Sequence, residues 1–434
     1  MKDYRFPPID LLKEHKCEDS GVSVRELDEN INRLKAVFSD YKIEVADVKA
    51  FVGAAVTLYK VSVRQDVRFP KIRRHLNDIE WALNTKNIRI VTLPDAIGIE
   101  IPNERPEKVS LKSMLDNDTF RNSKAVLPVA IGYTTMQEVK VFDLAKAPHL
   151  LVAGATGQGK SVCLDVIVTS LLYAKLPSEL KFVFIDPKMS EFSAFSELDY
   201  RYLAVLADTA SGKDAKSDAI VKDSVTAKRV LSSLCIEMER RYKLLSEAGI
   251  NNISHYNEKY KEHISDPDDS CRLLPYIVVM IDEYADLIMN GYDRNSKDTA
   301  KNTYSFIIRL AQEGRNAGIH LVIATQRPSR DIITGLIKAN FPTRFAFRVS
   351  TKADSLIITD SPGAEKLIGN GDMLYCSGTD MERLQCAMID EEEKNAVTKF
   401  IGEQVDEGNN CNVPYYLTAE DDINDDEETF NARR

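Results

Sequence analysis

Short apolar runs separated by longer amphipathic segments fill the chain from about residue 149 to residue 349. The runs lie at residues 149–153, 182–185, 276–281, 320–325 and 345–349. Apolar strands that alternate with helices are typical of a parallel sheet covered by helices on both faces. Open sheets of this kind bind ligands at the carboxyl ends of their strands. The pattern therefore predicts an α/β domain in which the residues after each run carry the function.

A different pattern occupies the first hundred residues. Ser23 and Glu26 have the spacing of a helix-capping box. Apolar residues recur after them at helical intervals, at Leu27, Ile31, Leu34 and Phe38. Strand-like runs follow at 54–63 and 97–101, and a second helix is predicted at about 69–83. These elements predict a small α+β domain, and none of its residues form a constellation typical of chemistry.

The two patterns divide the chain into four parts. We assign residues 1–25 to a polar linker, 26–125 to the small α+β domain, 126–405 to the α/β domain and 406–434 to an acidic tail. The tail is rich in charge and poor in apolar residues, so we expect it to be disordered. Two polar stretches, 210–223 and 290–303, are predicted to be surface insertions in the larger domain.

A glycine-rich turn follows the first apolar run. Residues 154–161 read GATGQGKS, a full match to the phosphate-binding P-loop, between a predicted strand and a predicted helix. Glycines allow backbone N–H groups to surround phosphates, and the helix N-terminus adds its dipole. Lys160 is expected to bridge the β- and γ-phosphates and Ser161 to ligate Mg²⁺. The residues predicted to bind ATP are Gly154, Ala155, Thr156, Gly157, Gln158, Gly159, Lys160, Ser161 and Val162.

Two acids end the apolar run at 276–281. Buried acids at a strand tip are costly unless they meet a cation. We expect Asp282 to hold Mg²⁺ through water and Glu283 to polarise the attacking water. Acids after a strand are often only part of a turn, but together with the P-loop they predict a hydrolytic site.

The run at 320–325 leads into Gln326, Arg327 and Pro328. Polar residues at this strand end, Gln326 above all, are placed to sense the γ-phosphate and report its loss. The alternative is that they only begin the next helix. The pattern leaves both interpretations open.

Charge is unevenly distributed along the chain. The net charge is −10, but residues 420–428 hold seven acids and no base, and the rest of the chain carries only −3. Residues 325–352 have a local charge of +5, from Arg327, Arg330, Lys338, Arg344, Arg348 and Lys352 against Asp331. A local field matters more to nucleic acid than net charge, so the acidic composition does not exclude DNA.

Cysteine usage and hydropathy bear on the compartment. The seven cysteines are scattered and never approach Cys-x-x-Cys spacing, which favours reduced thiols over a zinc site. No stretch approaches 18 consecutive apolar residues, and residues 1–10 lack the layout of a secretory signal. We therefore expect a cytoplasmic protein with no membrane-spanning segment in this chain.

Several motifs together resemble the motor of the FtsK/SpoIIIE family. They are PHLLVAGATGQGKSV, FIDPKM, LPYIVVMIDEYADLI, RLAQEGRNAGIHLVIATQRPSRDIITGLIKANFPTR, GNGDMLY and the upstream GIEIPNERPEKVSLKSML. The resemblance extends from about residue 4 to residue 400. It implies an α domain stacked on a RecA-like β domain of the P-loop NTPase class. It also implies a hexameric ring of identical subunits around double-stranded DNA, driven by ATP with Mg²⁺.

The resemblance assigns further residues. An arginine in such rings reaches the γ-phosphate of the neighbouring subunit, and Arg315 matches it, with Arg309 as the alternative. Either can also be an ordinary solvated helix arginine. The family's pore-facing DNA contacts match Arg327, Lys338 and Lys352, all inside the +5 segment. Contacts of this kind to phosphates give affinity without sequence information.

The chain departs from the family pattern in places. Leu356 stands where the family usually has an arginine, so that DNA contact is in doubt. The winged-helix γ domain and N-terminal membrane segments of the family have no counterpart here, so we expect the motor part of a longer, membrane-anchored protein or a shortened paralogue.

The leading hypothesis is a DNA translocase acting in chromosome segregation at cell division. A secretion or conjugation ATPase that moves protein or single-stranded DNA is the alternative within the same superfamily. A nucleotide-gated DNA-binding scaffold is the alternative from another class, and the intact Lys160, Asp282 and Glu283 argue against it.

Overall fold

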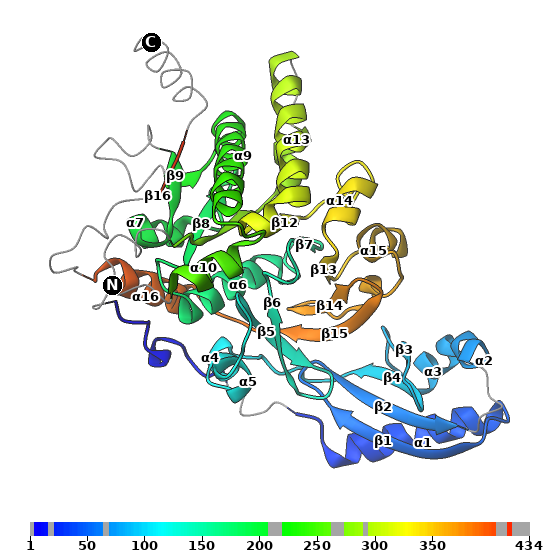
Figure 1. Ribbon diagram of the computed structural model, residues 1–434. Coiled ribbons are helices and arrows are strands. Elements are labelled where there is room, and N and C mark those ends of the chain that lie inside the picture. Colours follow the sequence, from blue (N-terminus) through cyan, green and yellow to red (C-terminus); the bar gives the residue numbers. More distant parts are fainter. Residues whose placement is uncertain are drawn as a thin grey trace, which may run out of the picture.

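Two β-sheets of different size organise the chain (Figure 1). The computed structural model describes residues 4–15, 21–63, 69–206, 219–261, 273–289, 294–404 and 415–418. Within these ranges a four-stranded antiparallel sheet builds a small domain, and a ten-stranded sheet builds a larger one. An α+β domain followed by an α/β domain is the order that the hydrophobic pattern predicts.

The small domain packs one long helix against its sheet. Helix α1, Val24–Asp40, begins where Ser23 Oγ accepts a hydrogen bond of 3.2 Å from Glu26 N, as the capping pattern predicts. The strands, in the order β1-β2-β4-β3, are β1 Val45–Val52, β2 Val56–Val63, β4 Ile97–Pro102 and β3 Arg89–Thr92. Leu34, Phe38, Tyr59 and Ile99 are buried in a core that belongs to this domain alone.

The helix predicted at 69–83 is divided in two. Helix α2, Phe69–Arg74, and helix α3, Leu76–Ala82, are separated at His75, whose φ of −94° and ψ of 14° leave the helical region. The ring of His75 stacks on Tyr41, with centroids 3.6 Å apart. A contact with a neighbouring element therefore accompanies this break, and the local apolar pattern does not contain it.

The boundary between the domains lies earlier than the predicted residue 125. Helices α4, Leu111–Leu115, and α5, Asp118–Arg121, bury Leu111, Met114 and Phe120 in the core of the larger domain. The last strand of the small sheet ends at Pro102. The sequence pattern missed this because two short helices can pack on either neighbour.

A buried ion network joins the two domains. Arg383 donates hydrogen bonds to Asp372 Oδ1 at 2.9 Å and Oδ2 at 2.6 Å, and its Nη1 donates to Glu100 Oε2 at 2.9 Å. Glu100 lies on β4 of the small domain, whereas Arg383 and Asp372 lie in the large sheet. All three side chains are at most 5% exposed. Because removal of one partner would leave a buried charge unpaired, this network favours a fixed contact between the domains.

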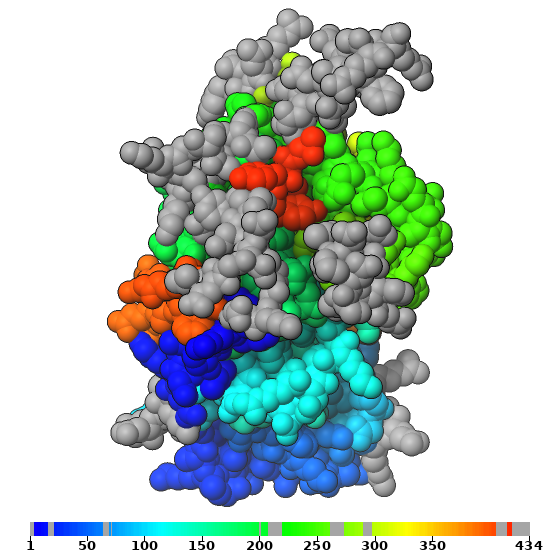
Figure 2. Space-filling model, turned by 60° about the vertical axis from the view of Figure 1, so that its left-hand side comes forward, coloured from blue at the N-terminus to red at the C-terminus, as the bar shows by residue number. Residues whose placement is uncertain are grey.

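The N-terminal segment, residues 4–15, does more than the predicted linker. It contains a short 3-10 helix, η1 Ile9–Leu11, and buries Leu12 against the larger domain. Lys13 contacts Asp390 and Glu392 at 3.2 and 2.6 Å, at the start of helix α16, Glu391–Gly402. Figure 2 shows this blue segment beside the orange α16. The segment therefore crosses the larger domain before the chain enters the small one.

The large sheet is mixed. Its strand order is β10-β8-β11-β12-β7-β13-β14-β15-β5-β6. The first six strands run parallel: β10 Ile220–Val221, β8 Leu180–Ile185, β11 Tyr276–Ile281, β12 Ile319–Thr325, β7 Leu150–Ala153 and β13 Thr343–Phe347. The five predicted apolar runs all fall in this parallel part. The other four are antiparallel and were not predicted: β14 Asp372–Ser377, β15 Asp380–Cys386, β5 Pro128–Thr134 and β6 Val139–Asp143.

Helices cover both faces of the parallel part (Figure 1). Alternate residues of β7 point to opposite faces, so Leu150 and Val152 join one core cluster and Leu151 and Ala153 join the other. The first face is covered by α6 Lys160–Ala174, α7 Asp199–Tyr202, α10 Ile253–Lys261, α16 and the 3-10 helix η2 Ser193–Leu198. The second is covered by α9 Ser224–Glu247, α12 Tyr284–Met289, α13 Arg294–Ala317, α14 Gly335–Asn340, α15 Lys352–Thr359 and η3 Ala364–Lys366.

Three stretches predicted to be peripheral contain regular structure. In the acidic tail, β16 Tyr415–Leu417 pairs in parallel with β9 Ala204–Leu206, and Leu417 is buried. The two predicted insertions contribute β10 and the first turns of α13. Residues 406–414, 419–434, 210–218 and 290–293, which complete those predictions, lie outside the described residues. Throughout the described ranges, no helix is both long and apolar enough to cross a membrane.

Candidate functional site

The P-loop lies between β7 and α6, as its sequence context predicts. Gly159 is the N-cap of α6 with a φ of 113°, a left-handed conformation that favours glycine. A Cβ at Gly159 would lie 2.8 Å from Gly371 N, and one at Gly154 would lie 2.5 Å from Phe347 Cβ. These two positions therefore exclude any side chain. The absence of side chains at both glycines lets the loop pack directly against Gly371 and Phe347.

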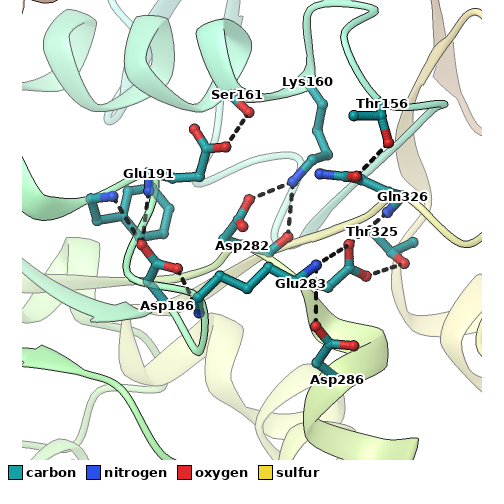
Figure 3. Close-up of polar contacts among 12 residues, drawn as sticks. Thr156, Lys160, Ser161, Asp186, Glu191, Asp282, Glu283, Asp286, Thr325 and Gln326 are labelled. Atoms are coloured by element: carbon teal, nitrogen blue, oxygen red, sulfur yellow. Dashed lines mark hydrogen bonds and ion pairs between the residues drawn. The ribbon is translucent and has the colours of Figure 1, made fainter.

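Lys160 and Asp282 form a buried ion pair at the mouth of this loop. Their side chains are 3% and 1% exposed. Lys160 Nζ also donates to the carbonyl oxygen of Asp282 at 3.2 Å. Burial raises the pKa of Asp282, and the ammonium of Lys160 opposes that rise. The P-loop lysine and the strand-end acid thus lie together, and each contacts the opposite charge (Figure 3). Their predicted roles toward phosphate and Mg²⁺ stay predictions.

Glu283 is fully buried and is held by the neighbouring strand end. Thr325 Oγ1 donates to Glu283 Oε1 at 2.7 Å, and Gln326 N donates to Oε2 at 3.0 Å. Lys188 Nζ lies 3.9 Å from the same Oε2. Strands β11 and β12 are adjacent and parallel, which brings their carboxyl ends together. The carboxylate therefore has a fixed orientation, which a general base requires.

Gln326 contacts the P-loop directly. Its side-chain Oε1 accepts a hydrogen bond of 2.7 Å from Thr156 Oγ1 (Figure 3). The backbone reinforces the contact, because Gly154 N donates to Thr325 O at 3.4 Å. The structure thus places Gln326 at the phosphate end of the site. A sensor role for it stays a prediction.

Three further residues reach the site from the end of β8. Ser161 Oγ donates to Glu191 Oε1 at 2.7 Å. Asp186 accepts from the backbone N–H groups of Glu191 and Phe192 at 2.9 and 3.2 Å, which shapes the turn (Figure 3). Lys188 lies 3.2 Å from Asp286. The sequence did contain one signal for these residues, because the acid Asp186 directly follows the apolar run at 182–185. Strand β8 pairs with β11 so that Ile185 lies opposite Ile281, and the residues after both strands therefore lie at the same end of the sheet.

A cavity of about 530 Å³ opens over the P-loop. From the loop and its surroundings it is lined by Ala155, Thr156, Gly157, Gly159, Lys160, Ser161, Val162 and Gln326. The remaining walls come from Ala55, residues 106–109, residues 368–371 and residues 385–388. Gly154 and Gln158 do not line it. Gly154 packs on Phe347, and Gln158 O accepts a hydrogen bond of 3.0 Å from Gly371 N. Both domains therefore contribute to the walls.

The donor set fits a nucleoside triphosphate with Mg²⁺. The glycine turn and the N-terminus of α6 favour an anion, and Lys160 supplies a buried positive charge. Ser161, Glu191 and Asp282 offer the hard oxygen ligands that Mg²⁺ prefers. Both predicted metal-binding residues lie beside Lys160: Ser161 follows it in the chain, and Asp282 is paired with it.

The two candidate arginine fingers lie away from this cavity. Arg315 is exposed in the last turn of α13, which precedes the amino end of β12. The P-loop contacts the carboxyl end of β12, and a seven-residue strand is roughly 20 Å long. Arg309 is paired with Glu239 at 2.5 Å and Glu313 at 3.7 Å. The structure therefore brings neither arginine to the site of its own chain.

The predicted DNA contacts occupy several elements. Arg327 is exposed and lies 3.7 Å from Asp286. Lys352 is exposed at the first position of α15, and Leu356 is 41% exposed on the same helix. Lys338, on α14, is 2.5 Å from Asp360. Acids from outside the +5 segment therefore contact two of the three candidates.

Known proteins share this sequence over most of its length. A model of the FtsK/SpoIIIE family matches residues 110–330, and a model of the FtsK alpha domain matches residues 6–103. The chain is 41% identical over 418 residues to the DNA translocase FtsK of Chlorobaculum tepidum, covering 95% of the chain and 49% of that protein. It is 40% identical over 409 residues to the DNA translocase FtsK of Bacillus cereus, covering 93% and 49%. The chain thus spans about half the length of these curated relatives.

Solved structures share the fold. The pCW3 conjugation coupling protein TcpA superimposes with a TM-score of 0.57 at 23% identity, covering 86% of this chain and 99% of that one. The cytoplasmic domain of the type VII secretion ATPase EccC of Thermomonospora curvata gives a TM-score of 0.54 at 20% identity, covering 70% and 35%. The predicted P-loop ATPase fold is confirmed. With family models matched across both domains and relatives at about 40% identity, the chain belongs to the FtsK/SpoIIIE family.

Proposed function

We propose that this chain is the ATP-hydrolysing motor of a double-stranded DNA translocase. The observation that carries the proposal is that Lys160, Asp282 and Glu283, all at most 3% exposed, lie together beside the P-loop. Asp282 pairs with Lys160, and Glu283 binds Gln326, which contacts Thr156 of the loop. A protein that only binds nucleotide has no need of a fixed, buried carboxylate beside the phosphates. The names of the relatives supply the DNA and the translocation.

Each residue then has a role in hydrolysis. Lys160 exchanges its contact with Asp282 for the β- and γ-phosphate oxygens, which frees that carboxylate for the cation. Ser161, and Asp282 through water, would hold Mg²⁺, which would neutralise charge on the phosphates when bound. Glu283 orients and polarises the attacking water, and Gln326 responds to the presence of the γ-phosphate. Thr325 and the backbone of Gln326 fix the base.

A ring of identical subunits, with six as the family number, completes the site. Arg315 is exposed and lies near the amino end of β12, whereas its own P-loop contacts the carboxyl end of that strand. This position supports a role at the site of a neighbouring chain. An arginine supplied in this way stabilises negative charge on the transferred phosphoryl group. The ring is then needed for hydrolysis as well as for enclosing DNA.

Duplex DNA passes through the ring and contacts Arg327, Lys338 and Lys352. Their positive charge and their place in the +5 segment support phosphate contacts that are independent of sequence. Chromosome segregation at cell division, in the cytoplasm, is the process that we propose for the motor, by analogy with the relatives named DNA translocase FtsK.

Steady-state phosphate release with and without linear duplex DNA tests the proposal. We expect duplex DNA to raise the rate of phosphate release several-fold above the basal rate. The reason is that DNA contacts inside the ring favour assembly of the complete site. Stimulation by single-stranded DNA or by a protein, with none by duplex, would instead indicate a conjugation or secretion ATPase. Absence of phosphate release under every condition would indicate a nucleotide-gated scaffold.

A further inference from the structure

The carboxylate of Asp360 is held by two cations of the +5 segment. Lys338 Nζ lies 2.5 Å from Asp360 Oδ1, and Arg344 Nη1 lies 2.7 Å from Oδ2. The three residues come from different elements: Lys338 from α14, Arg344 from β13 and Asp360 from the C-terminal end of α15. One anion therefore joins two basic side chains, each of which takes one oxygen.

The carboxylate is the outermost of the three groups. The Asp360 side chain is 57% exposed, whereas those of Lys338 and Arg344 are 25% and 12% exposed. Solvent thus reaches the acid more readily than the cations that it covers. Two cations that each hold one oxygen of a single anion also suit the two free oxygens of a backbone phosphate.

Arg344 does not depend on Asp360 for its position. Its Nη1 also donates to Ile358 O at 2.9 Å, and its Nε donates to Phe341 O at 3.3 Å. These two carbonyl contacts would hold the guanidinium in place if the acid moved away. The site for an anion is therefore built into the fold, and Lys338, with its longer flexible stem, can follow the anion.

Asp360 occupies an unfavourable place for an acid. It is the C-cap of α15, with a φ of 61°, and its N–H donates to Leu356 O. Negative charge is disfavoured at a helix C-terminus. Partial burial acts to raise the pKa of Asp360, and hydrogen bonds from Lys338 and Arg344 outweigh this and lower it. The two cations thus offset the unfavourable position of this charged acid.

We propose that Lys338 and Arg344 form a binding site for a phosphate of the DNA backbone, and that Asp360 occupies this site in the DNA-free chain as an internal competitor. This inference rests on the proposed function, and it adds Arg344 and Asp360 to the residues that set DNA affinity. A phosphate that enters displaces the carboxylate into solvent. When the phosphate leaves, the carboxylate returns, so the contact is easily exchanged from one phosphate to the next.

The substitution Asp360→Asn tests the role of the carboxylate as a competitor while keeping the fold. Asparagine tolerates the left-handed conformation of this residue, and its amide oxygen can still accept one hydrogen bond. The substitution therefore removes the negative charge and little else. Asp380→Asn removes the same charge from the exposed first residue of β15 and serves as the matched control.

Binding of linear duplex DNA of two unrelated sequences, at several salt concentrations, is the measurement. We expect Asp360→Asn to bind both sequences roughly threefold more tightly than Asp380→Asn, which is the order of one added phosphate contact at moderate salt. The gain should disappear when Lys338→Ala is combined with Asp360→Asn, because the freed cation is then absent. Arg344→Gln should weaken binding of both sequences equally.

The outcomes distinguish two failures. If Lys338→Ala and Arg344→Gln leave binding and its salt dependence unchanged, the duplex runs elsewhere and the proposed DNA surface is wrong. If those variants weaken binding but Asp360→Asn matches Asp380→Asn, the competitor is wrong while the DNA surface stands. Asp360→Gly, which also suits a left-handed residue, repeats the test if the asparagine variant unfolds at a lower temperature than the unchanged chain.

Discussion

Thr325 and Glu283 are joined by a hydrogen bond of 2.7 Å in which the threonine hydroxyl donates to the carboxylate. Thr325 is the last residue of β12, and Gln326 and Arg327 follow it directly. The residue proposed to activate water is therefore in contact with the strand that leads to the proposed DNA-binding segment. A change at the phosphates can reach that segment through two side chains.

Thr325→Val tests this link. Valine keeps the shape of threonine but cannot donate, so Glu283 loses one of the two hydrogen bonds that orient it. We expect turnover to fall by about tenfold with nucleotide affinity little changed, because a general base depends on its orientation. Thr169→Val is the matched control: the Thr169 hydroxyl is buried and has no partner among the described residues. Equal rates for the two variants would show that the hydrogen bond does not position the base.

Glu283→Gln should separate binding from chemistry. The amide fills the same space and can still accept from Thr325, but it cannot take a proton. Nucleotide affinity should be retained while phosphate release falls by about 10²-fold or more. Lys160→Ala and Asp282→Ala should abolish hydrolysis through loss of the phosphate and metal contacts. Near-normal turnover in Glu283→Gln would assign the base to another residue, with Glu191 as the next acid to test.

Mixing variants tests whether Arg315 acts on a neighbouring chain. Arg315→Ala should bind nucleotide normally and fail to hydrolyse it. Mixed with Lys160→Ala, it should recover part of the activity, because some interfaces then pair an intact P-loop with an intact arginine. Arg309→Ala, which changes the alternative arginine of the same helix, is mixed with Lys160→Ala in parallel and decides between the two candidates. Absence of recovery in assemblies proven to exchange subunits would exclude a shared site.

Leu356→Arg should increase the affinity for duplex DNA. Leu356 is 41% exposed, so an arginine can replace it without disturbing the core. The salt dependence of duplex binding, as log K against log[salt], should become steeper by roughly 0.9 if the new side chain reaches a phosphate. Val225→Arg adds the same charge at another exposed site, on α9, and should not change this slope. Identical slopes would place α15 away from the duplex.

The burial of His149 predicts that the free energy of unfolding falls in acid. Burial, with help from nearby His320 and Arg315, lowers the pKa of His149 to about 3. The unfolded chain, with a pKa of about 6.5, takes up the proton first, so this stability is present above pH 6.5 and is lost as pH falls toward 3. Leu321 N donates to His149 Nδ1 at 3.0 Å. His149→Asn, which can accept that bond and does not titrate, should lose less stability between pH 7 and pH 5 in denaturant unfolding; a loss equal to that of the unchanged chain would contradict the prediction.

The parts of the site that could be predicted are those that neighbour each other in sequence or lie on adjacent strands. The P-loop is a local pattern, and the meeting of Lys160 with Asp282 follows from strands with aligned carboxyl ends. Glu191 was missed because its contact with Ser161 depends on a turn shaped by Asp186, which no periodicity encodes.

The same reason explains the other differences. Asp360 meets Arg344 because α15 ends in a left-handed residue, and β16 forms because a three-residue strand finds β9 some 200 residues earlier. β5 is buried along almost its whole length and its register shifts between Ala130 and Gly132, so it shows no alternation of apolar and polar residues that would reveal a strand. Contacts that are distant in sequence decide each of these features.

The path of the N-terminal segment bears on how the proposed motor would transmit force between its domains. Lys13 and Leu12 bind residues 4–15 to the larger domain. The small domain therefore lies, in the chain, between two stretches that both pack on the larger domain. The second stretch is the return into α4, and the Arg383 network adds a third attachment. A pull on the small domain is therefore shared among several points, and a single hinge between the domains does not have to bear it alone. In the proposed motor, a force that arises at the P-loop would therefore be transmitted to both domains through several contacts.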